Sequence, residues 1–175
     1  MREHVVIVGG SSGMGRALAA ELVAQGSEVT VAGRSPDKLD AVRRELGVRT
    51  VAMDLGAEQD IERLFATTGK VSHRPGPRAS LLVALNGALA SLAAALAVEL
   101  ARLRVNVVSP GWVDTPIWQD VAGDTAPETL AAMAARLPVG RIGRAQDIAA
   151  AIIALLRNGF ITGTVLHADG GHRLA

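Results

Sequence analysis

The sequence predicts an α/β fold built on a doubly wound parallel sheet. Residues 5–8 are four consecutive apolar residues, followed at once by a glycine-rich turn and a helical segment that stops at Gly26. Apolar runs and helical segments then alternate as far as residue 67. An alternation of this kind is typical of parallel strands joined by crossover helices, because each helix covers one face of the sheet.

Local signals define the elements of the first half. Leu18 and Leu22 recur at helical spacing in the first helix. Ser35 is a good N-cap, the proline after it suits a first helical turn, and Gly47 is a good helix stop. The expected order is a strand at 5–8, a helix at 16–26, a strand at 29–33, a helix at 36–46, a strand at 49–54 and a helix at 57–67.

The alternation breaks after residue 67. Residues 69–78 are polar and proline-rich, which excludes a central strand. Residues 79–98 contain no charge and are long enough to span a bilayer. Small and polar residues interrupt this segment, and its leucines form one stripe, so we expect a helix packed within the domain and no membrane span. The stripe consists of Leu81, Leu85, Leu89, Leu92, Leu96 and Leu100.

The remaining elements complete one domain over residues 1–175, a length that suits a single core. The net charge of +1 does not favour nucleic acid or an anionic membrane as a partner. The expected elements are a strand at 104–109, a loop at 110–116, helices at 127–136 and 146–156, and a strand at 164–168.

Cysteine is absent, which excludes disulfides and thiolate metal sites, and we expect no metal. The N-terminus enters a strand without the layout of a signal peptide, so we expect a cytoplasmic protein.

The glycine-rich turn is the first candidate binding site. Its spacing is Gly-x-x-x-Gly-x-Gly, at Gly9, Gly13 and Gly15. A turn between a strand and a helix presents backbone N–H groups and a helix N-terminus to a phosphate, and a β-carbon would hold the phosphate away. The alternative is a structural turn without a ligand. The candidate residues are Gly9, Ser11, Ser12, Gly13, Met14 and Gly15.

Taken together, several segments resemble the short-chain dehydrogenase/reductase family, in family order and over nearly the whole chain. They are residues 8–15, Asp54-Leu55, residues 95–101, residues 104–111 continuing to Thr115, residues 138–143 with Asp147-Ile148, and residues 161–171. The resemblance implies a Rossmann-like domain, a nicotinamide dinucleotide cofactor and an oxidoreductase.

Two regions depart from the family pattern. The family's fourth strand, fourth helix and fifth strand have no counterpart, so we expect five parallel strands in the order 3-2-1-6-7. The missing part normally carries the catalytic serine. The family's Tyr-x-x-x-Lys positions align with Leu82 and Asn86, and the chain has no tyrosine. We therefore assign no catalytic residue; Ser80 and His73 are replacements in principle only.

The family comparison extends the candidate cofactor site. Dinucleotide-binding folds often place an acid after the second strand to bind the ribose 2′-OH, whereas Arg34 and Ser35 suit a 2′-phosphate, so NADP is favoured over NAD. The alternative for Arg34 is a solvated loop residue. The resemblance also implies cofactor contacts at Asp54, Leu55, Asn86, Pro110, Gly111, Val113 and Thr115. Asp54 can instead be a strand-end cap, and Thr115 the N-cap of a following helix.

Two functions remain open. The first is an NADP-dependent oxidoreductase with a degenerate active site, acting on an unknown small-molecule substrate. The second is a non-catalytic nucleotide-binding or structural derivative of the family. In either case we expect a homodimer or homotetramer, because the long helix has a face of small residues that suits close helix pairing. This face consists of Ala84, Gly87, Ala88, Ser91 and Ala95.

Overall fold

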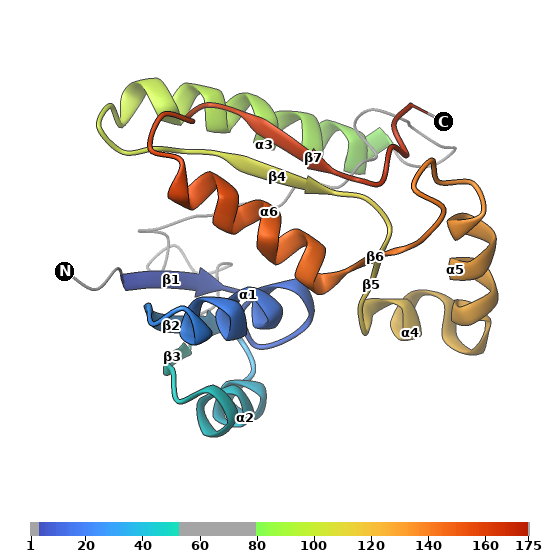
Figure 1. The fold of residues 1–175 in the computed structure, drawn as a ribbon, viewed down its shortest axis with the longest axis horizontal. Helices are drawn as coiled ribbons and strands as arrows, with labels where there is room; N and C mark the ends of the chain where they lie inside the picture. The colour runs from blue at the N-terminus through green and yellow to red at the C-terminus, as the bar shows by residue number, and fades with distance from the viewer. Residues whose placement is uncertain (1–3, 53–79, 175) are drawn as a thin grey trace. The chain divides into compact units, whose positions relative to one another are not determined.

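A computed structural model describes residues 4–52 and 80–174 of the chain. It divides the chain into two compact units, unit 1 (Met1–Phe65) and unit 2 (Ala66–Ala175). Both contain parallel strands accompanied by helices (Figure 1). The α/β class is therefore confirmed, whereas the prediction of a single domain over residues 1–175 stays a prediction.

Unit 1 contains a three-stranded parallel sheet with β2 in the centre. Val5 of the first strand lies opposite Val29, and Thr30 lies opposite Arg49 of the third strand. The sheet follows the predicted order 3-2-1. Its elements are β1 (His4–Val8), α1 (Gly13–Ala24), β2 (Glu28–Gly33), α2 (Pro36–Leu46) and β3 (Arg49–Ala52).

The core of unit 1 forms around β2, which is buried at every residue except Glu28. Val31 is completely buried, because β2 has a strand on each side and contacts both helices. Leu18 and Leu22 of α1 and Leu39 of α2 are buried as well. Burying an aliphatic side chain of this size contributes about 1.5–3 kcal/mol, so this shared core stabilises the unit.

The predicted boundaries of α2 are confirmed. The Ser35 hydroxyl accepts a hydrogen bond from the Lys38 backbone N–H at 3.5 Å. Gly47 adopts the left-handed conformation at the C-terminal end, with φ of 66°. Gly26 has φ of 84° just after α1, which explains why the chain turns there into β2. Residues 53–67, with the expected third helix, lie outside the described residues.

Unit 2 pairs β4 with β7 and the very short β5 with β6, both in parallel. The predicted strand order places the family's strands 6 and 7 side by side, and β4 and β7, which correspond to them, are paired in this way. The elements are α3 (Ser80–Glu99), β4 (Val107–Pro110), β5 (Val113–Asp114), α4 (Ile117–Ala122), η3 (Gly123–Thr125), α5 (Ala126–Ala134), β6 (Gly143–Arg144), α6 (Ala145–Arg157) and β7 (Val165–Ala168).

The expected sheet order 3-2-1-6-7 thus occurs as two blocks, one in each unit, and the join between the blocks stays a prediction. The segment 110–116, expected to be a loop, contains β5, and α4 follows it. Sequence patterns missed both elements, because two strand residues and six helical residues are too few to show a period.

The strand expected at 104–109 is shorter, because its first three residues bind the turn before β7 instead. The Arg104 guanidinium donates to the carbonyl oxygens of Leu155 and Leu156, both at 2.8 Å, at the end of α6. It also donates to the carbonyls of Asn158 and Ile161, both at 3.1 Å. A cation at a helix C-terminus satisfies carbonyls that the helix leaves open and interacts favourably with the helix dipole.

The leucine stripe of α3 is exposed at two of its described positions. Leu92 and Leu100 are 45% and 44% exposed, whereas Asn86 and Ala93 are 6% and 4% exposed. At these positions the helix presents the smaller Asn86 and Ala93 to its own unit, and Leu92 and Leu100 face away from it. The predicted small-residue face is largely exposed at Ala84, Ala88, Ser91 and Ala95.

Among the described residues, no helix is both long enough and apolar enough to cross a membrane. The predicted cytoplasmic location stays a prediction.

The first prediction concerns Arg104. Arg104→Met keeps the length of the side chain but removes its donors, so it should lower the free energy of unfolding by about 3 kcal/mol. Urea unfolding followed by circular dichroism measures this loss. Arg136→Met, at an exposed position of unit 2, is the control and should change stability by less than about 0.5 kcal/mol. Equal effects of both substitutions would contradict the assignment.

Candidate functional site

The turn after β1 has a backbone that requires glycine. Gly9 has φ of 78° and Gly13 has φ of 52°, which side-chain-bearing residues rarely adopt. The Gly9 N–H donates to the Ala32 carbonyl at 2.8 Å and ties the turn to the end of β2. A β-carbon on Gly9 would meet no atom within 4 Å, so the requirement there is conformational rather than steric.

Gly15 is required for a different reason. A β-carbon on Gly15 would lie 2.5 Å from the Gly9 carbonyl oxygen and 2.9 Å from the Gly10 Cα. The first turn of α1 therefore packs directly on the backbone of the turn. Gly10, which the sequence analysis missed, is also crowded: its β-carbon would lie 3.0 Å from both Ile7 Cγ2 and Val31 Cγ1. The pair of adjacent glycines, Gly9 and Gly10, is the sequence feature that could have indicated this requirement.

The N-terminus of α1 suits an anion. Ser12 is the N-cap residue, but its side chain makes no capping hydrogen bond, and the first turn holds no acidic residue. The first backbone N–H groups of a helix have no partner within the helix and carry the positive end of its dipole. The left-handed turn and this helix end together fit the pyrophosphate of a dinucleotide.

Arg34 follows β2 and is exposed. Among the described residues its side chain makes no ion pair or hydrogen bond. Ser35 is engaged as the N-cap of α2, and Arg16 pairs with Glu45, which lowers the pKa of that carboxyl. Within the described part of the chain, Arg34 is thus a basic side chain beside this turn without a partner. Gly33, the residue before Arg34, has no side chain. A β-carbon there would contact Ser11 Oγ at 3.5 Å, so its absence leaves space between the end of β2 and the glycine turn.

The second group of predicted cofactor residues lies in unit 2. Pro110 and Val113 are buried and Thr115 is partly buried. Gly111 is crowded, because its β-carbon would lie 2.6 Å from Asp169 Cα. The N-cap of α4 is Pro116, so Thr115 does not hold the N-cap position that was its alternative interpretation.

Other predicted residues are only partly described. Asn86 is buried in α3, whereas Asp54, Leu55 and His73 lie outside the described residues. Leu82 and Ser80 belong to α3, but the description does not include their side chains. The predicted cofactor residues are thus divided between the two units, and their meeting in one site stays a prediction.

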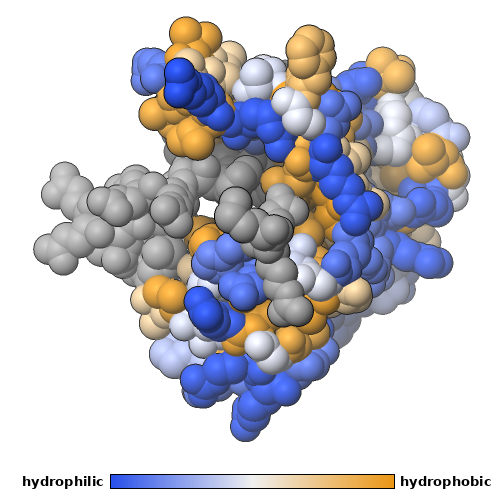
Figure 2. Space-filling view, turned by 60° about the vertical axis from the view of Figure 1, so that its left-hand side comes forward, coloured by the Kyte–Doolittle hydropathy of each residue, from blue (hydrophilic) through white to orange (hydrophobic). Residues whose placement is uncertain are grey.

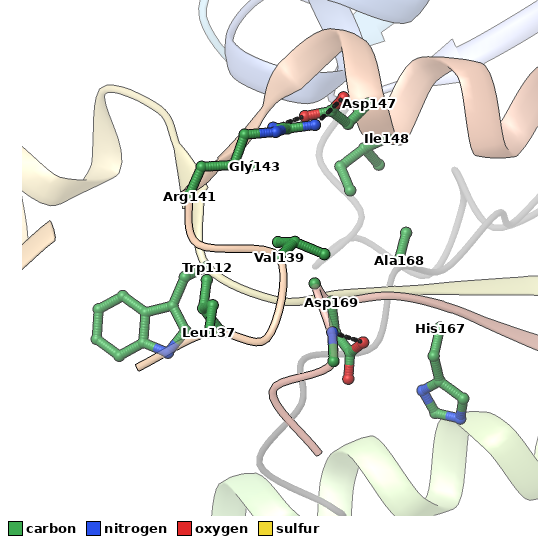
Figure 3. A pocket seen from close by; sticks show the side chains of 12 residues that line it. Trp112, Leu137, Val139, Arg141, Gly143, Asp147, Ile148, His167, Ala168 and Asp169 are labelled. Atoms are coloured by element: carbon green, nitrogen blue, oxygen red, sulfur yellow. Dashed lines mark hydrogen bonds and ion pairs between the residues drawn. The ribbon is translucent and has the colours of Figure 1, made fainter. Parts of the chain in front are cut away.

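A pocket of about 320 Å³ in unit 2 was not predicted as a site (Figure 3). The sequence analysis used several of its residues only as family motifs, since their spacing alone does not indicate a cavity. The pocket is lined by Trp112, Leu137, Val139, Arg141, Gly143, Asp147, Ile148, His167, Ala168, Asp169, Gly170 and Gly171.

An ion pair fixes the loop that leads from the pocket into α6. The Arg141 guanidinium donates to both oxygens of Asp147, at 2.7 and 3.0 Å. The Arg144 N–H also donates to Asp147, at 2.7 Å, so the carboxylate covers the N-terminus of α6. These interactions lower the pKa of Asp147 to about 2; the Arg141 hydrogen bonds have the largest effect, and the Arg144 N–H has the next largest.

An aromatic cluster borders the same pocket. The rings of Trp112 and Trp118 stack with centroids 4.6 Å apart, and His172 meets Trp112 edge-on. Trp118 Nε1 donates to the Val113 carbonyl at 2.7 Å, which holds α4 against β5. These are the only two tryptophans of the sequence. Among the described residues, no group of three or more His, Asp or Glu side chains can hold a metal ion.

A parallel sheet whose first strand ends in a glycine turn against a helix N-terminus defines a dinucleotide-binding type of α/β protein. Family models agree with this class. The model described as short chain dehydrogenase matches residues 3–75, and the model described as Enoyl-(Acyl carrier protein) reductase matches residues 70–173. The chain belongs to the short-chain dehydrogenase/reductase family, whose members are oxidoreductases that bind a nicotinamide dinucleotide.

Individual relatives support this assignment. The short-chain dehydrogenase/reductase malC of Malbranchea aurantiaca is 40% identical over 105 residues, which are 60% of this chain and 40% of malC. The chain thus spans about two fifths of the length of the first curated relatives that it matches. The structure of the MalC Reductase/Diels-Alderase superposes with a TM-score of 0.91 and 25% identity, over 99% of this chain and 97% of that one.

Two further relatives bear on cofactor and length. A small-chain dehydrogenase in complex with NADPH has a TM-score of 0.79 and 25% identity, with complete coverage of both chains. Glucose 1-dehydrogenase of Gluconobacter oxydans is 27% identical in an alignment of 244 residues that covers 97% of this chain and 91% of the relative. Because this chain has 175 residues, that alignment must leave many positions of the relative without a counterpart in this chain.

The second prediction concerns pH. The pKa of Asp147 is lowered from 3.8 to about 2, so its ion pair stabilises the folded state above about pH 4 and loses this contribution as the pH falls toward about 2. Asp147→Asn should therefore cost about 1 kcal/mol at neutral pH, a small value because the pair is partly exposed. The difference between the two proteins should become much smaller at about pH 2.5, as the contribution of the ion pair is lost.

Urea unfolding at neutral pH and at about pH 2.5 measures both differences. Asp124→Asn, at an exposed carboxylate, is the matched control. A stability difference for Asp147→Asn that stays constant down to the lower pH would show that the ion pair is not its cause.

Proposed function

We propose that this chain binds NADP(H) in preference to NAD(H). The observation that carries the proposal is Arg34, exposed at the end of β2 and without an ionic partner among the described residues. A guanidinium matches the geometry of a phosphate, and an acid that would select the 2′-OH of NAD does not occupy this position. The related small-chain dehydrogenase that holds NADPH supports the same choice.

The residues proposed to hold the dinucleotide are those predicted from the sequence. The left-handed turn and the N-terminus of α1 receive the pyrophosphate, and Arg34 with Ser35 receives the 2′-phosphate. Asp54 and Leu55 contact the adenine, and the nicotinamide half is received by Asn86, Pro110, Gly111, Val113 and Thr115. A bound dinucleotide supplies the hydride in this family; the protein's own contribution is to position the ring and to donate a proton to the developing alkoxide.

That proton donor is the part this chain lacks. The sequence contains no tyrosine, and Leu82 stands at the family position, where it can neither donate nor ionise. Asn86 replaces the lysine and carries no charge. The gaps in the glucose dehydrogenase alignment are consistent with a chain shortened relative to this relative. We therefore propose a degenerate active site, in a chain shortened relative to its family.

The second candidate function is a non-catalytic nucleotide-binding or structural protein, and the missing Tyr-Lys pair favours it. The two candidates share the cofactor site and differ in turnover. We further propose a homodimer or homotetramer. The small-residue face of α3 is largely exposed, and Leu92 and Val98 on this helix are 45% and 77% exposed. Figure 2 shows further hydrophobic side chains among hydrophilic ones on the surface.

The third prediction tests the cofactor preference. Arg34→Glu should weaken NADPH binding by about 1.5–3 kcal/mol, the range of a charge-assisted hydrogen bond, and should affect NADH far less. Each cofactor is titrated into the protein, and binding is followed by the melting temperature or by tryptophan fluorescence. Arg44→Glu, an exposed arginine of α2, is the control for net charge. Equal losses for both cofactors would refute the role of Arg34, and no binding of either cofactor would favour a structural protein.

The fourth prediction concerns turnover. Purified protein should consume no NADPH with a panel of ketones and aldehydes, because the proton donor of the family is absent. Absorbance of NADPH over time measures this. Turnover that survives both Ser80→Ala and His73→Ala would reveal another donor and would contradict the degenerate site.

The fifth prediction concerns assembly. Light scattering should show a dimer or larger species, because pairing of the small-residue face buries apolar surface at about 25 cal/mol per Å². Ala88→Glu and Ala95→Glu should shift the protein toward monomers or aggregates. A monodisperse monomer with equally stable variants would exclude this interface.

A further inference from the structure

The pocket of unit 2 has an apolar wall and an acidic end. Leu137 and Ile148 are buried, and Val139 lines the pocket with them (Figure 3). Asp169 follows directly on β7 and also lines this pocket (Figure 3). Apolar walls with a few polar groups are typical of sites for small molecules.

The charges along the pocket do not cancel. Arg141 and Asp147 neutralise each other, because both guanidinium donors engage both carboxylate oxygens. Asp169 has no such compensation. It is only 8% exposed, and within the described part of the chain it forms no ion pair. A buried carboxylate without a cation is unfavourable, so it attracts a positive charge.

Asp169 also keeps acceptor capacity. One of its oxygens accepts the Gly171 N–H at 3.0 Å, and the other accepts the Arg173 N–H at 3.2 Å. An ionised carboxylate has about four lone-pair positions, so two backbone donors leave positions for further N–H groups. The two backbone bonds also hold the carboxylate in place, which lowers the entropy cost of binding.

We propose that this pocket binds a small organic amine, protonated at neutral pH, whose ammonium group pairs with Asp169 and whose compact apolar body lies against Leu137, Val139 and Ile148. A volume of about 320 Å³ limits the ligand to a small molecule. Carboxylates and phosphates are excluded as ligands, because Arg141 is already engaged and Asp169 repels them. This proposal does not depend on cofactor binding.

Tryptophan fluorescence of the full chain tests the proposal without cofactor, because Trp112 lines the pocket and Trp118 stacks on it. The probes are cyclohexylamine and its neutral analogue cyclohexanol, which share a ring and differ in charge. The amine should change the fluorescence saturably and bind at least ten times more tightly than the alcohol. Equal binding of both, or no saturable change with the amine, would overturn the proposal.

Two variants locate the site. Asp169→Asn should reduce amine binding at least tenfold. Because it also alters the turn at residues 169–173, Val139→Phe provides a second test: it fills the pocket from an exposed position and leaves the carboxylate untouched. It should abolish amine binding while circular dichroism stays unchanged. Val98→Phe, at an exposed valine of α3, is the control and should bind normally. Unchanged binding by Val139→Phe would exclude this pocket.

Discussion

Close approach of two backbones, possible only where a β-carbon is missing, is the constraint on which this structure depends. In unit 1 the helix α1 begins against the Gly9 carbonyl, and Gly15 alone permits that distance. In unit 2 the end of β4 touches the backbone at Asp169 through Gly111. Both contacts occur at the C-terminal ends of parallel strands, where ligands bind in open α/β sheets. The positions that fix the fold therefore also shape the candidate sites.

Unit 2 is also held together by polar side chains, which form hydrogen bonds to backbone groups. Arg104 donates hydrogen bonds to four carbonyl oxygens at and beyond the end of α6. The Asn106 side chain donates to the Ile161 carbonyl and accepts from the Thr164 N–H. These bonds join β4, α6 and the start of β7 without a long strand. Because α6 and β7 both line the pocket, the same side chains maintain its walls.

The proposed degenerate active site and the exposed apolar side chains concern the same helix, α3. In a family enzyme the inner face of this helix serves chemistry, whereas here it buries Asn86 and Ala93. The outer face leaves leucine and alanine in contact with solvent. These exposed apolar side chains support the proposed pairing of α3 with another copy of the chain.

The sequence by itself determined the strand–helix alternation, the caps of α2, the glycine turn and the family, because these depend on residues near one another along the chain. The tertiary structure alone decided which face of α3 is buried, where β4 begins, and that β5 pairs with β6. It also assembled the pocket from Trp112, residues 137–148 and residues 167–171. Such features depend on contacts between residues distant in sequence, such as Arg104 with Leu155, and no local period encodes them.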